Sequence, residues 1–463
     1  MTQMIDEPTA HAWAALGGAS ELVAGVAYEG PGDGLPSRLP VRELARATVG
    51  VCSLAAAELL AARNGGGVPA VRVDEGAVAT AFVSERHLRI DGRAPVSFAP
   101  LSGFWRTADG WVRTHANYPH HRARLLAALG LPDTPDSDGD GGDGHDEAMV
   151  QRLAAELAGR TAESVQEAVY AAGGLAVAVA GPPQLPPSLP LVETRRIAAR
   201  SAALPSAELP AAGLRVLDLT RVIAGPVATR TLALLGADVL RVDSPGLPES
   251  EEAHADTGFG KRSTRLDLER AADRAVFEQL LDEADVLVSG YRPGALERHG
   301  LSAAALAERR PGLVLAELCA WGWSGPWSGR RGFDSLVQAG SGIAVTEAAA
   351  DGRPGVLPAQ ALDHGTGYLL AAAVLRAVTE RQASGAGTQL RLSLAGTAGW
   401  LTGGLAAARA GQGTHEAARW LGGTRTPHGL LTYALPPIGY AGAPADWSRG
   451  PGRWGTDTPT WTA

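Results

Sequence analysis

An aspartate and a histidine stand side by side at the start of a long apolar segment, "LPAQALDHGTGYLLAAAVLRAV", residues 357–378. The Asp363 carboxylate can act as a nucleophile or base, and His364 can exchange protons near neutral pH. The position also suits a helix N-cap, because an Asp side chain accepts hydrogen bonds from the free amides of a first turn. Gly365 and Gly367 allow another backbone or a ligand to approach closely. The N-cap is the simpler interpretation of Asp363, and a catalytic role is the alternative.

Three basic residues are candidates for binding an anion. Lys261 and Arg262 stand in "GFGKRSTRLDL", just before a predicted strand, and Arg292 stands in "GYRPGAL", after another strand. A guanidinium can donate two parallel hydrogen bonds to a phosphate, and an ammonium binds a phosphate as a compact positive charge. For Lys261 and Arg262 the alternatives are a solvated basic turn and phosphate binding. For Arg292 they are a surface charge and a ligand contact at the carboxyl end of a strand.

Strands and helices alternate from residue 214 onward. "LRVLDLT", "GPVATRTLALLG" and "ADVLRVD" read as strand, helix and strand, and two further units of this kind follow. Apolar strands alternating with helices predict an α/β fold: a doubly wound parallel, Rossmann-like sheet with both faces covered. Ligands of such sheets bind at the carboxyl ends of the strands. The first strand is followed by "TRVIAGP" rather than G-x-G-x-x-G, so a dinucleotide site is not favoured.

The earlier part of the chain has a different pattern and contains a degenerate repeat. The segment from Leu44 aligns with the segment from Ala361 as helix, Gly-rich turn and strand, and setting Gly50 on Gly367 places Arg46 opposite Asp363. We predict three parts: a degenerate copy of the region around Asp363, a small α+β domain ending in a Pro-rich linker, and the Rossmann-like domain. Their residues are 1–85, 86–205 and 206–463.

Composition limits the classes of partner. The 463 residues include 41 basic and 49 acidic side chains, a net charge of −8, which gives no bulk attraction to nucleic acid or anionic membranes. The start has no signal-peptide pattern and no apolar run is long enough to span a membrane, so we expect a cytoplasmic protein. Cys52 and Cys319 lie in apolar segments, as expected of reduced, buried thiols.

An acidic stretch, residues 133–148, raises the question of a metal. Its match to the EF-hand spacing consists of Asp136, Asp138, Asp140, Gly141 and Glu147. Asp143, however, stands where that loop normally has an apolar residue, and a tract of Asp and Gly meets the pattern by chance. We therefore expect a solvated loop and no metal.

Five segments in order carry a resemblance to a known family. They are "RVLDLTRVIAGPVATRTLALLGADVLRVDSPG", "GKRSTRLDL", "ADVLVSGYRPGALERHGL", "GFDSLVQAGSG" and "LDHGTGYLLAAAVLRAVTER". They resemble family III CoA-transferases, the CaiB/BaiF type that includes formyl-CoA and carnitine CoA-transferases. "FAPLSGFWRTADGWVRTHANYPHHRARLLAALGLP" resembles the region that comes after the catalytic helix in that family, so the order is rearranged. Whether the halves complete one site within a chain or across a dimer stays open.

The resemblance implies roles for particular residues. Asp363 is then the nucleophile, which attacks an acyl-CoA thioester to give an aspartyl anhydride and afterwards an aspartyl-CoA thioester. Amides at the helix start would stabilise developing negative charge. The expected contacts with CoA are Val222, Ile223 and Ala224 at the adenine, Lys261 and Arg262 at the phosphates, and Arg292. Coenzyme A, as acyl-CoA, and a carboxylic acid are expected as substrates, with no tightly bound cofactor and with a homodimer as the assembly.

Two alternatives remain. The family also includes racemases of 2-methylacyl-CoA, whose histidine base falls where this chain has Phe333, and a phenyl ring cannot take a proton. The rearranged order also leaves open a non-catalytic CoA-binding protein.

Overall fold

The computed structural model describes residues 6–95, 98–133, 143–181, 189–197, 202–406 and 414–462. Its largest sheet has seven strands in the order β10-β9-β8-β11-β12-β13-β7. Neighbours from β10 to β13 are parallel, and β7 runs antiparallel to β13. The strands are β7 (Glu193–Ile197), β8 (Arg215–Leu219), β9 (Asp238–Asp243), β10 (Arg262–Arg265), β11 (Val286–Ser289), β12 (Val314–Cys319) and β13 (Gly387–Ser393). The predicted α/β fold with a mostly parallel sheet is confirmed.

The direction in which strands are added reverses beside β8. From β8 the chain adds β9 and β10 on one side, and then β11, β12 and β13 on the other. The loops that follow β8 and β11 therefore diverge and leave a crevice at the carboxyl ends of these strands.

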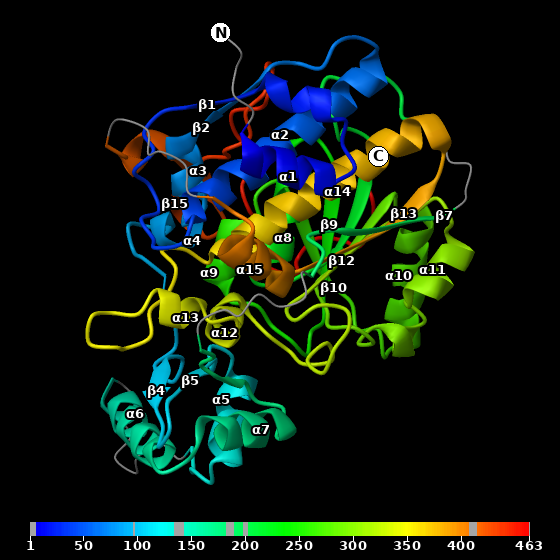
Figure 1. Ribbon diagram of the computed structural model, residues 1–463. Helices are drawn as coiled ribbons and strands as arrows, with labels where there is room; N and C mark the ends of the chain where they lie inside the picture. The colour runs from blue at the N-terminus through cyan, green and yellow to red at the C-terminus, as the bar shows by residue number, and fades with distance from the viewer. Residues whose placement is uncertain are drawn as a thin grey trace.

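Alternate side chains of the strands enter two separate cores. Val216 and Val288 pack in the core that includes α8 and α14, whereas Leu217 and Leu287 pack in the core that includes α10 and α11. This follows from the two-residue period of a strand. Figure 1 shows these helices around the sheet. Their bounds are α8 (Ala224–Leu234), α10 (Ala271–Glu283), α11 (Ala303–Arg309), α14 (Ala361–Ser384) and α15 (Leu394–Gly403).

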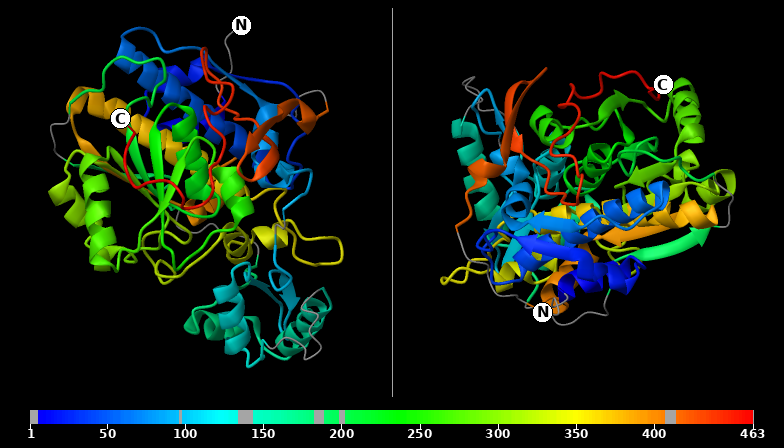
Figure 2. Two further views of the ribbon diagram at one scale, coloured as in Figure 1. Left: turned by 180° about the vertical axis from the view of Figure 1, so that it is seen from behind. Right: turned by 90° about the horizontal axis from the view of Figure 1, so that it is seen from above.

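The two segments of the predicted repeat form helices of equal length. α2 (Val41–Asn64) packs along α14, as seen from above in Figure 2, and each helix has 24 residues. The residues before them have nearly equal backbone angles, φ −75° and ψ 57° at Pro40 and φ −74° and ψ 62° at Gln360. Counted from these starts, Glu43 rather than Arg46 corresponds to Asp363.

The segment around α2 belongs to the main body of the molecule. α2 is apolar and long enough to cross a membrane, but most of it is buried inside the protein, as in a core helix. β3 pairs with β15, so the chain before residue 90 shares a sheet with the C-terminal region. The predicted domain limits stay a prediction, and these contacts cross them. The elements are α1 (Glu7–Ala15), η1 (Ser20–Gly25), β1 (Val26–Glu29), β2 (Val71–Asp74), α3 (Glu75–Ala81), α4 (Ser84–His87), β3 (Arg89–Ile90), β14 (Leu421–Thr426) and β15 (Gly429–Ala434).

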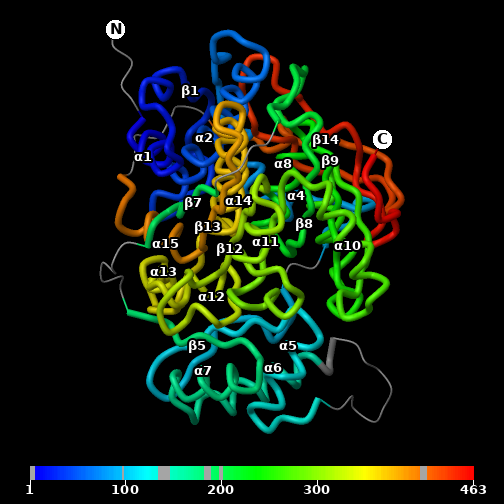
Figure 3. Tube along the Cα trace, turned by 90° about the vertical axis from the view of Figure 1, so that its right-hand side faces the viewer, coloured from blue at the N-terminus to red at the C-terminus, as the bar shows by residue number. Residues whose placement is uncertain are grey.

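A smaller part with its own core lies below the main body in Figures 1 and 3. Its antiparallel sheet has the order β4-β5-β6 and packs with three helices. The elements are β4 (Phe104–Arg106), β5 (Trp111–Thr114), α5 (Pro119–Ala128), α6 (Asp143–Ala158), α7 (Ala162–Ala171) and β6 (Ala176–Ala178). The helices α12 (Asp334–Gly340) and α13 (Ile343–Thr346) lie between it and the main sheet in Figure 3. Asp136, Asp138, Asp140 and Gly141 of the EF-hand pattern lie outside the described residues.

The C-terminal segment covers the free edge of β10. The Ser263 amide donates to the Asp457 carboxylate at 2.8 Å, and the Asp457 amide donates to the Ser263 carbonyl at 2.7 Å. These bonds satisfy backbone groups that an edge strand would otherwise expose. The remaining elements are α9 (Glu251–Thr257), η2 (Glu297–His299) and η3 (Ala417–Trp420).

Candidate functional site

A cavity of about 680 Å³ lies at the carboxyl ends of the parallel strands. Val222 follows β8, Arg292 follows β11, and both line it, together with Asp363. The smaller part of the molecule contributes Tyr118 and Arg124. The cavity is therefore lined by both halves of one chain, at the edge of the sheet where ligands of such folds bind.

Asp363 is the third residue of α14 and lines the cavity, with 6% of its surface exposed. The helix N-cap is Gln360, whose side chain makes no capping bond, so the N-cap interpretation of Asp363 is wrong. Asp334 satisfies the amides instead: its Oδ2 accepts from the Leu362 amide at 2.9 Å and from the Asp363 amide at 3.0 Å. Because capping comes from another segment, the Asp363 carboxylate is not committed to its own helix start.

Burial and two other acids disfavour the ionised form of Asp363. Its pKa is raised well above the usual value, mainly by burial and then by the charges of Asp334 and Glu85. The pKa of Asp334 is also raised by burial, but Asp334 accepts from two amides and from the Gln338 side chain. Three donors favour the anion of Asp334, so Asp363 is the member of the pair that holds a proton to higher pH.

His364 faces the protein interior instead of the cavity. It is fully buried, its Nε2 lies 3.2 Å from Oε2 of Glu85, and its ring packs on Phe82 at a centroid distance of 5.4 Å. Burial alone would raise the pKa of Glu85, but the hydrogen bond and charge of His364 outweigh burial and lower it. Glu85 lies on α4, so this contact joins the N-terminal half to the start of α14.

The predicted adenine-binding residues lie at the turn between β8 and α8. Val222 and Ala224 line the cavity, whereas Ile223 is the N-cap of α8 and packs against the main core. Val222 has a φ of 70°, which is strained for a β-branched residue. Its amide donates to a Glu249 carboxylate oxygen at 3.1 Å, and the Tyr118 hydroxyl donates to the other oxygen at 2.7 Å. The buried Glu249 carboxylate thus ties this turn to the smaller part of the molecule.

The three basic candidates separate in the structure. Arg292 is exposed at the cavity. Lys261 is buried and donates to Asp218 at 3.1 Å, and Arg262 donates to both carboxylate oxygens of Asp238. Arg262 begins β10, so these two residues lie at the amino end of a strand, away from the carboxyl ends that form the cavity. Phosphate binding by Lys261 and Arg262 stays a prediction, and the structure gives both side chains other partners.

Phe333 lies in the cavity wall and stacks face to face on His115, with 4.0 Å between ring centroids. Burial lowers the pKa of His115 to about 3, so this imidazole is neutral near pH 7. Sequence reasoning missed His115, Tyr118, Glu85 and Asp334. The "FD" at the start of α12 did contain Asp334, but no local pattern connects it with a helix that starts 27 residues later.

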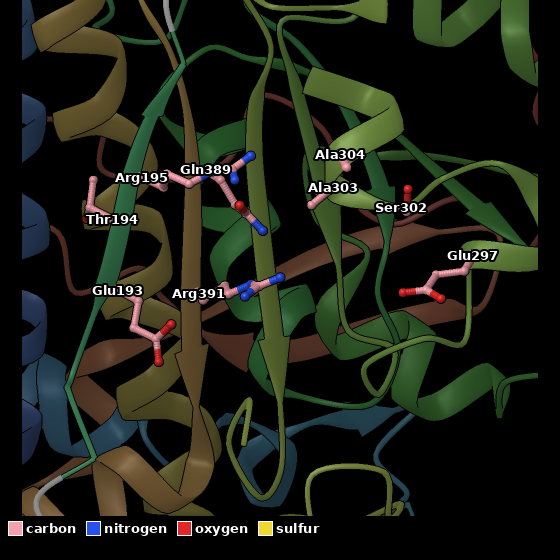
Figure 4. Close-up of a pocket in the computed structure, with 9 residues that line it drawn as sticks. All are labelled: Glu193, Thr194, Arg195, Glu297, Ser302, Ala303, Ala304, Gln389 and Arg391. Atoms are coloured by element: carbon pink, nitrogen blue, oxygen red, sulfur yellow. The ribbon is translucent and has the colours of Figure 1, made fainter. Parts of the chain in front are cut away.

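A second cavity, of about 410 Å³, lies beside β7, β13 and α11 (Figure 4). None of the predicted site residues lines it, and Arg391 and Gln389 in its wall both contact Glu317. Within the described ranges, no group of three or more His, Cys, Asp or Glu side chains is arranged to hold a metal ion.

Comparison with known proteins shows which family this sequence matches. The sequence model of CoA-transferase family III matches residues 13–197 and 211–435. The chain is 33% identical over 198 residues to the probable fatty acyl-CoA transferase Rv3272 of Mycobacterium tuberculosis, covering 40% of this chain and 50% of that protein. It is 32% identical over 194 residues to the formyl-CoA:oxalate CoA-transferase of Afipia carboxidovorans, covering 39% of this chain and 46% of that protein.

One of these relatives also has a solved structure that matches. A crystal structure of Rv3272 matches with 34% identity and a TM-score of 0.39, covering 41% of this chain and 54% of that one. A CAIB/BAIF family protein from Brucella suis matches with 26% identity and a TM-score of 0.38, covering 48% of this chain and 65% of that one. The chain thus spans about half the length of these two curated relatives. With both of its halves matched by the family model, the chain belongs to CoA-transferase family III.

Proposed function

We propose that the protein transfers coenzyme A from an acyl-CoA thioester to a carboxylic acid, with Asp363 as the covalent nucleophile. The observation that carries this proposal is the Asp363 carboxylate in the cavity wall, at the first turn of α14, with its helix amides already capped by Asp334. A nucleophile needs lone pairs that are not tied up in structural bonds, and this arrangement leaves them to a substrate.

In the first half of the reaction, a carboxylate oxygen of Asp363 attacks the thioester carbonyl, the C–S bond breaks and CoA leaves as the thiolate. The products are an acyl-aspartyl anhydride and bound CoA thiolate. The thiolate then attacks the Asp363 carbonyl, which releases the donor acid as its carboxylate and leaves an aspartyl-CoA thioester. No proton is gained or lost in these two steps, and covalent catalysis divides one difficult exchange into easier ones.

In the second half, the acceptor carboxylate attacks the aspartyl-CoA thioester and again forms an anhydride and a thiolate. Attack of the thiolate on the acceptor acyl carbon gives the new acyl-CoA and regenerates Asp363. The raised pKa of Asp363 makes its carboxylate more basic and hence a stronger nucleophile once ionised.

The position of the cavity supports CoA as the substrate. In a doubly wound, Rossmann-like sheet a nucleotide lies at the strand-order reversal, where Val222, Ala224 and Arg292 line the cavity. We assign the adenine end of CoA to the turn after β8, which places the thioester toward Asp363.

Intact-protein mass spectrometry tests the proposal. The wild type is incubated with acetyl-, succinyl- or palmitoyl-CoA and trapped with hydroxylamine or borohydride, beside Asp363→Asn and the surface control Asp351→Asn. We expect a modification located at Asp363 in the wild type and the control, and a loss of exchange of about a thousandfold or more in Asp363→Asn. CoA binding without any adduct, or normal exchange by Asp363→Asn, would contradict the proposal.

A further inference from the structure

Six arginines line the large cavity, and they differ in their partners. The lining includes Arg124, Arg221, Arg292, Arg298, Arg330 and Arg331. Three lie within 4 Å of a carboxylate: Arg221 of Glu249, Arg298 of Glu269 and Arg330 of Glu167. The other three form no ion pair with any acid in the part of the chain that the structure describes.

These three arginines come from separate segments. Arg124 lies on α5 in the smaller part, Arg292 follows β11, and Arg331 precedes α12. For Arg124, one bond is found among the described residues, a long one of 3.3 Å from Nη1 to the Gly173 carbonyl. Most of their donor capacity is therefore open to the cavity.

Their positive charges act on one another. Burial lowers the pKa of Arg331, and the charges of Arg292 and then Arg124 lower it further. Burial likewise lowers the pKa of His120, which also lines the cavity, with added effects of Arg124, Arg221 and Arg331. The lining also contains Asp243, Asp267, Glu269 and Asp363, but none of these acids, all of which the structure describes, forms an ion pair with the three arginines. Like charges without a paired carboxylate raise the energy of the empty cavity, and a bound anion lowers it.

We propose that Arg124, Arg292 and Arg331 form an oxyanion subsite that holds a phosphate or carboxylate group of a substrate. The inference rests on the proposed function, which supplies two sources of such a group: the phosphates of CoA and a second carboxylate on the acid substrate. Planar guanidinium groups bind both through paired N–H donors, and three of them surround an oxyanion from different sides.

The fold holds Arg124 in place for this task. α5 begins directly after Tyr118, whose hydroxyl is fixed by Glu249, and that carboxylate also binds the Val222 amide. Tyr118 and Arg124 both line the cavity, so this bond fixes the start of α5 beside it. An anion bound between Arg124 and Arg292 joins the two halves of the chain.

Isothermal titration calorimetry distinguishes the sources. Arg124→Gln/Arg331→Gln and Arg292→Gln are compared with the wild type and with Arg353→Gln, a control whose arginine pairs with Asp351 on an exposed turn. The probes are CoA, 3′-dephospho-CoA and pantetheine, and the four-carbon acids succinate and butyrate. Circular dichroism and thermal unfolding establish that each variant is folded.

We expect the double variant to bind at least one oxyanion probe about tenfold or more weakly, since charge-assisted hydrogen bonds are lost. Weaker CoA binding with unchanged pantetheine binding identifies a phosphate, and 3′-dephospho-CoA separates the 3′-phosphate from the diphosphate. Weaker succinate binding with unchanged butyrate binding identifies a carboxylate. Unchanged affinity for all five probes in folded variants overturns the subsite, as does equal weakening in Arg353→Gln.

This test is separate from the test of Asp363. Arginine-dependent binding with no adduct on Asp363 keeps the subsite and removes the proposed reaction. An adduct on Asp363, together with probe binding that is unchanged in the arginine variants, keeps the proposed reaction and removes the subsite.

Discussion

Asp334 and Asp363 are two buried carboxylates that differ in their partners. Asp334 caps the helix amides, and Asp363 stands beside it in the cavity wall. The arrangement has an electrostatic cost, because two buried carboxylates lie close together and the pKa of Asp363 is raised. It also leaves the proposed nucleophile in the first turn of α14, where the helix dipole favours negative charge.

Asp334→Asn should therefore shift the pH dependence of the reaction. The charge of Asp334 raises the pKa of Asp363, so its removal lowers that pKa and leaves Asp363 ionised at lower pH. We expect the acid limb of the pH profile for trapping at Asp363 to move to lower pH. We also expect the free energy of unfolding to fall by about 1 kcal/mol, since an amide replaces only part of the capping. An acid limb that stays in place, as expected for the control Asp351→Asn, would show that the two carboxylates are not coupled.

At the residue scale, local patterns predicted the position of Asp363 but not its partners. Capping rules concern the residues around a helix start, whereas Asp334 and Glu85 come from distant segments. Arg292 was found because it follows a strand of a parallel sheet, whereas Val222 was found through the family resemblance. Lys261 and Arg262 precede a strand, and that fact, visible in the sequence, places them at the opposite end of it.

At the scale of elements, the start of α14 is held by a short helix from the N-terminal half. Glu85 on α4 contacts His364, and Ser84 beside it donates to Asp256 at 2.9 Å and accepts from Arg230 at 3.1 Å. α2 packs along the rest of α14. The N-terminal helix α2, which has Glu43 at the position of Asp363, thus supports the helix that carries the catalytic candidate.

Glu85→Gln tests this support through stability. The pKa of folded Glu85 is lowered from 4.5, so its stabilising effect is complete above pH 4.5 and is lost as pH falls through the folded pKa. We expect a loss of about 1 kcal/mol in the free energy of unfolding near pH 7, from urea denaturation, and a smaller loss in acid. The exposed Glu308→Gln serves as the control. An equal loss at both pH values would mean that the charge of Glu85 is not what stabilises the contact.

The order of strands and helices followed from hydrophobic periodicity, because most strands of the parallel sheet are rich in Val and Leu, as in β11 and β12. The register of the repeat did not. Matching Gly50 to Gly367 placed Arg46 opposite Asp363, but the helix starts place Glu43 there. Glycines in a helix mark close contacts, which differ between two copies that pack on different neighbours.

At the scale of the molecule, one chain supplies a cavity from two segments, both of which the family model matches. Tyr118, Arg124 and Glu85 come from the first half, and Asp363, Asp334 and Val222 from the second. Ordinary contacts join them, including the Tyr118–Glu249 and Glu85–His364 bonds. The sequence left open whether such halves meet within a chain or between chains, since order along a chain does not fix which copies pair.

Co-expression of two inactive variants decides whether the working site is built within one chain. Asp363→Ala removes the proposed nucleophile from the second half. Arg124→Glu places a negative charge, which repels an oxyanion, in the proposed subsite of the first half. If each chain completes its own site, every site in the mixture carries one of the lesions, and neither exchange nor trapping at Asp363 returns. If sites formed across a dimer with random pairing, about a quarter of them would combine two intact halves. Recovery to that level, measured against wild type purified with the same pair of tags, would refute a site contained in a single chain.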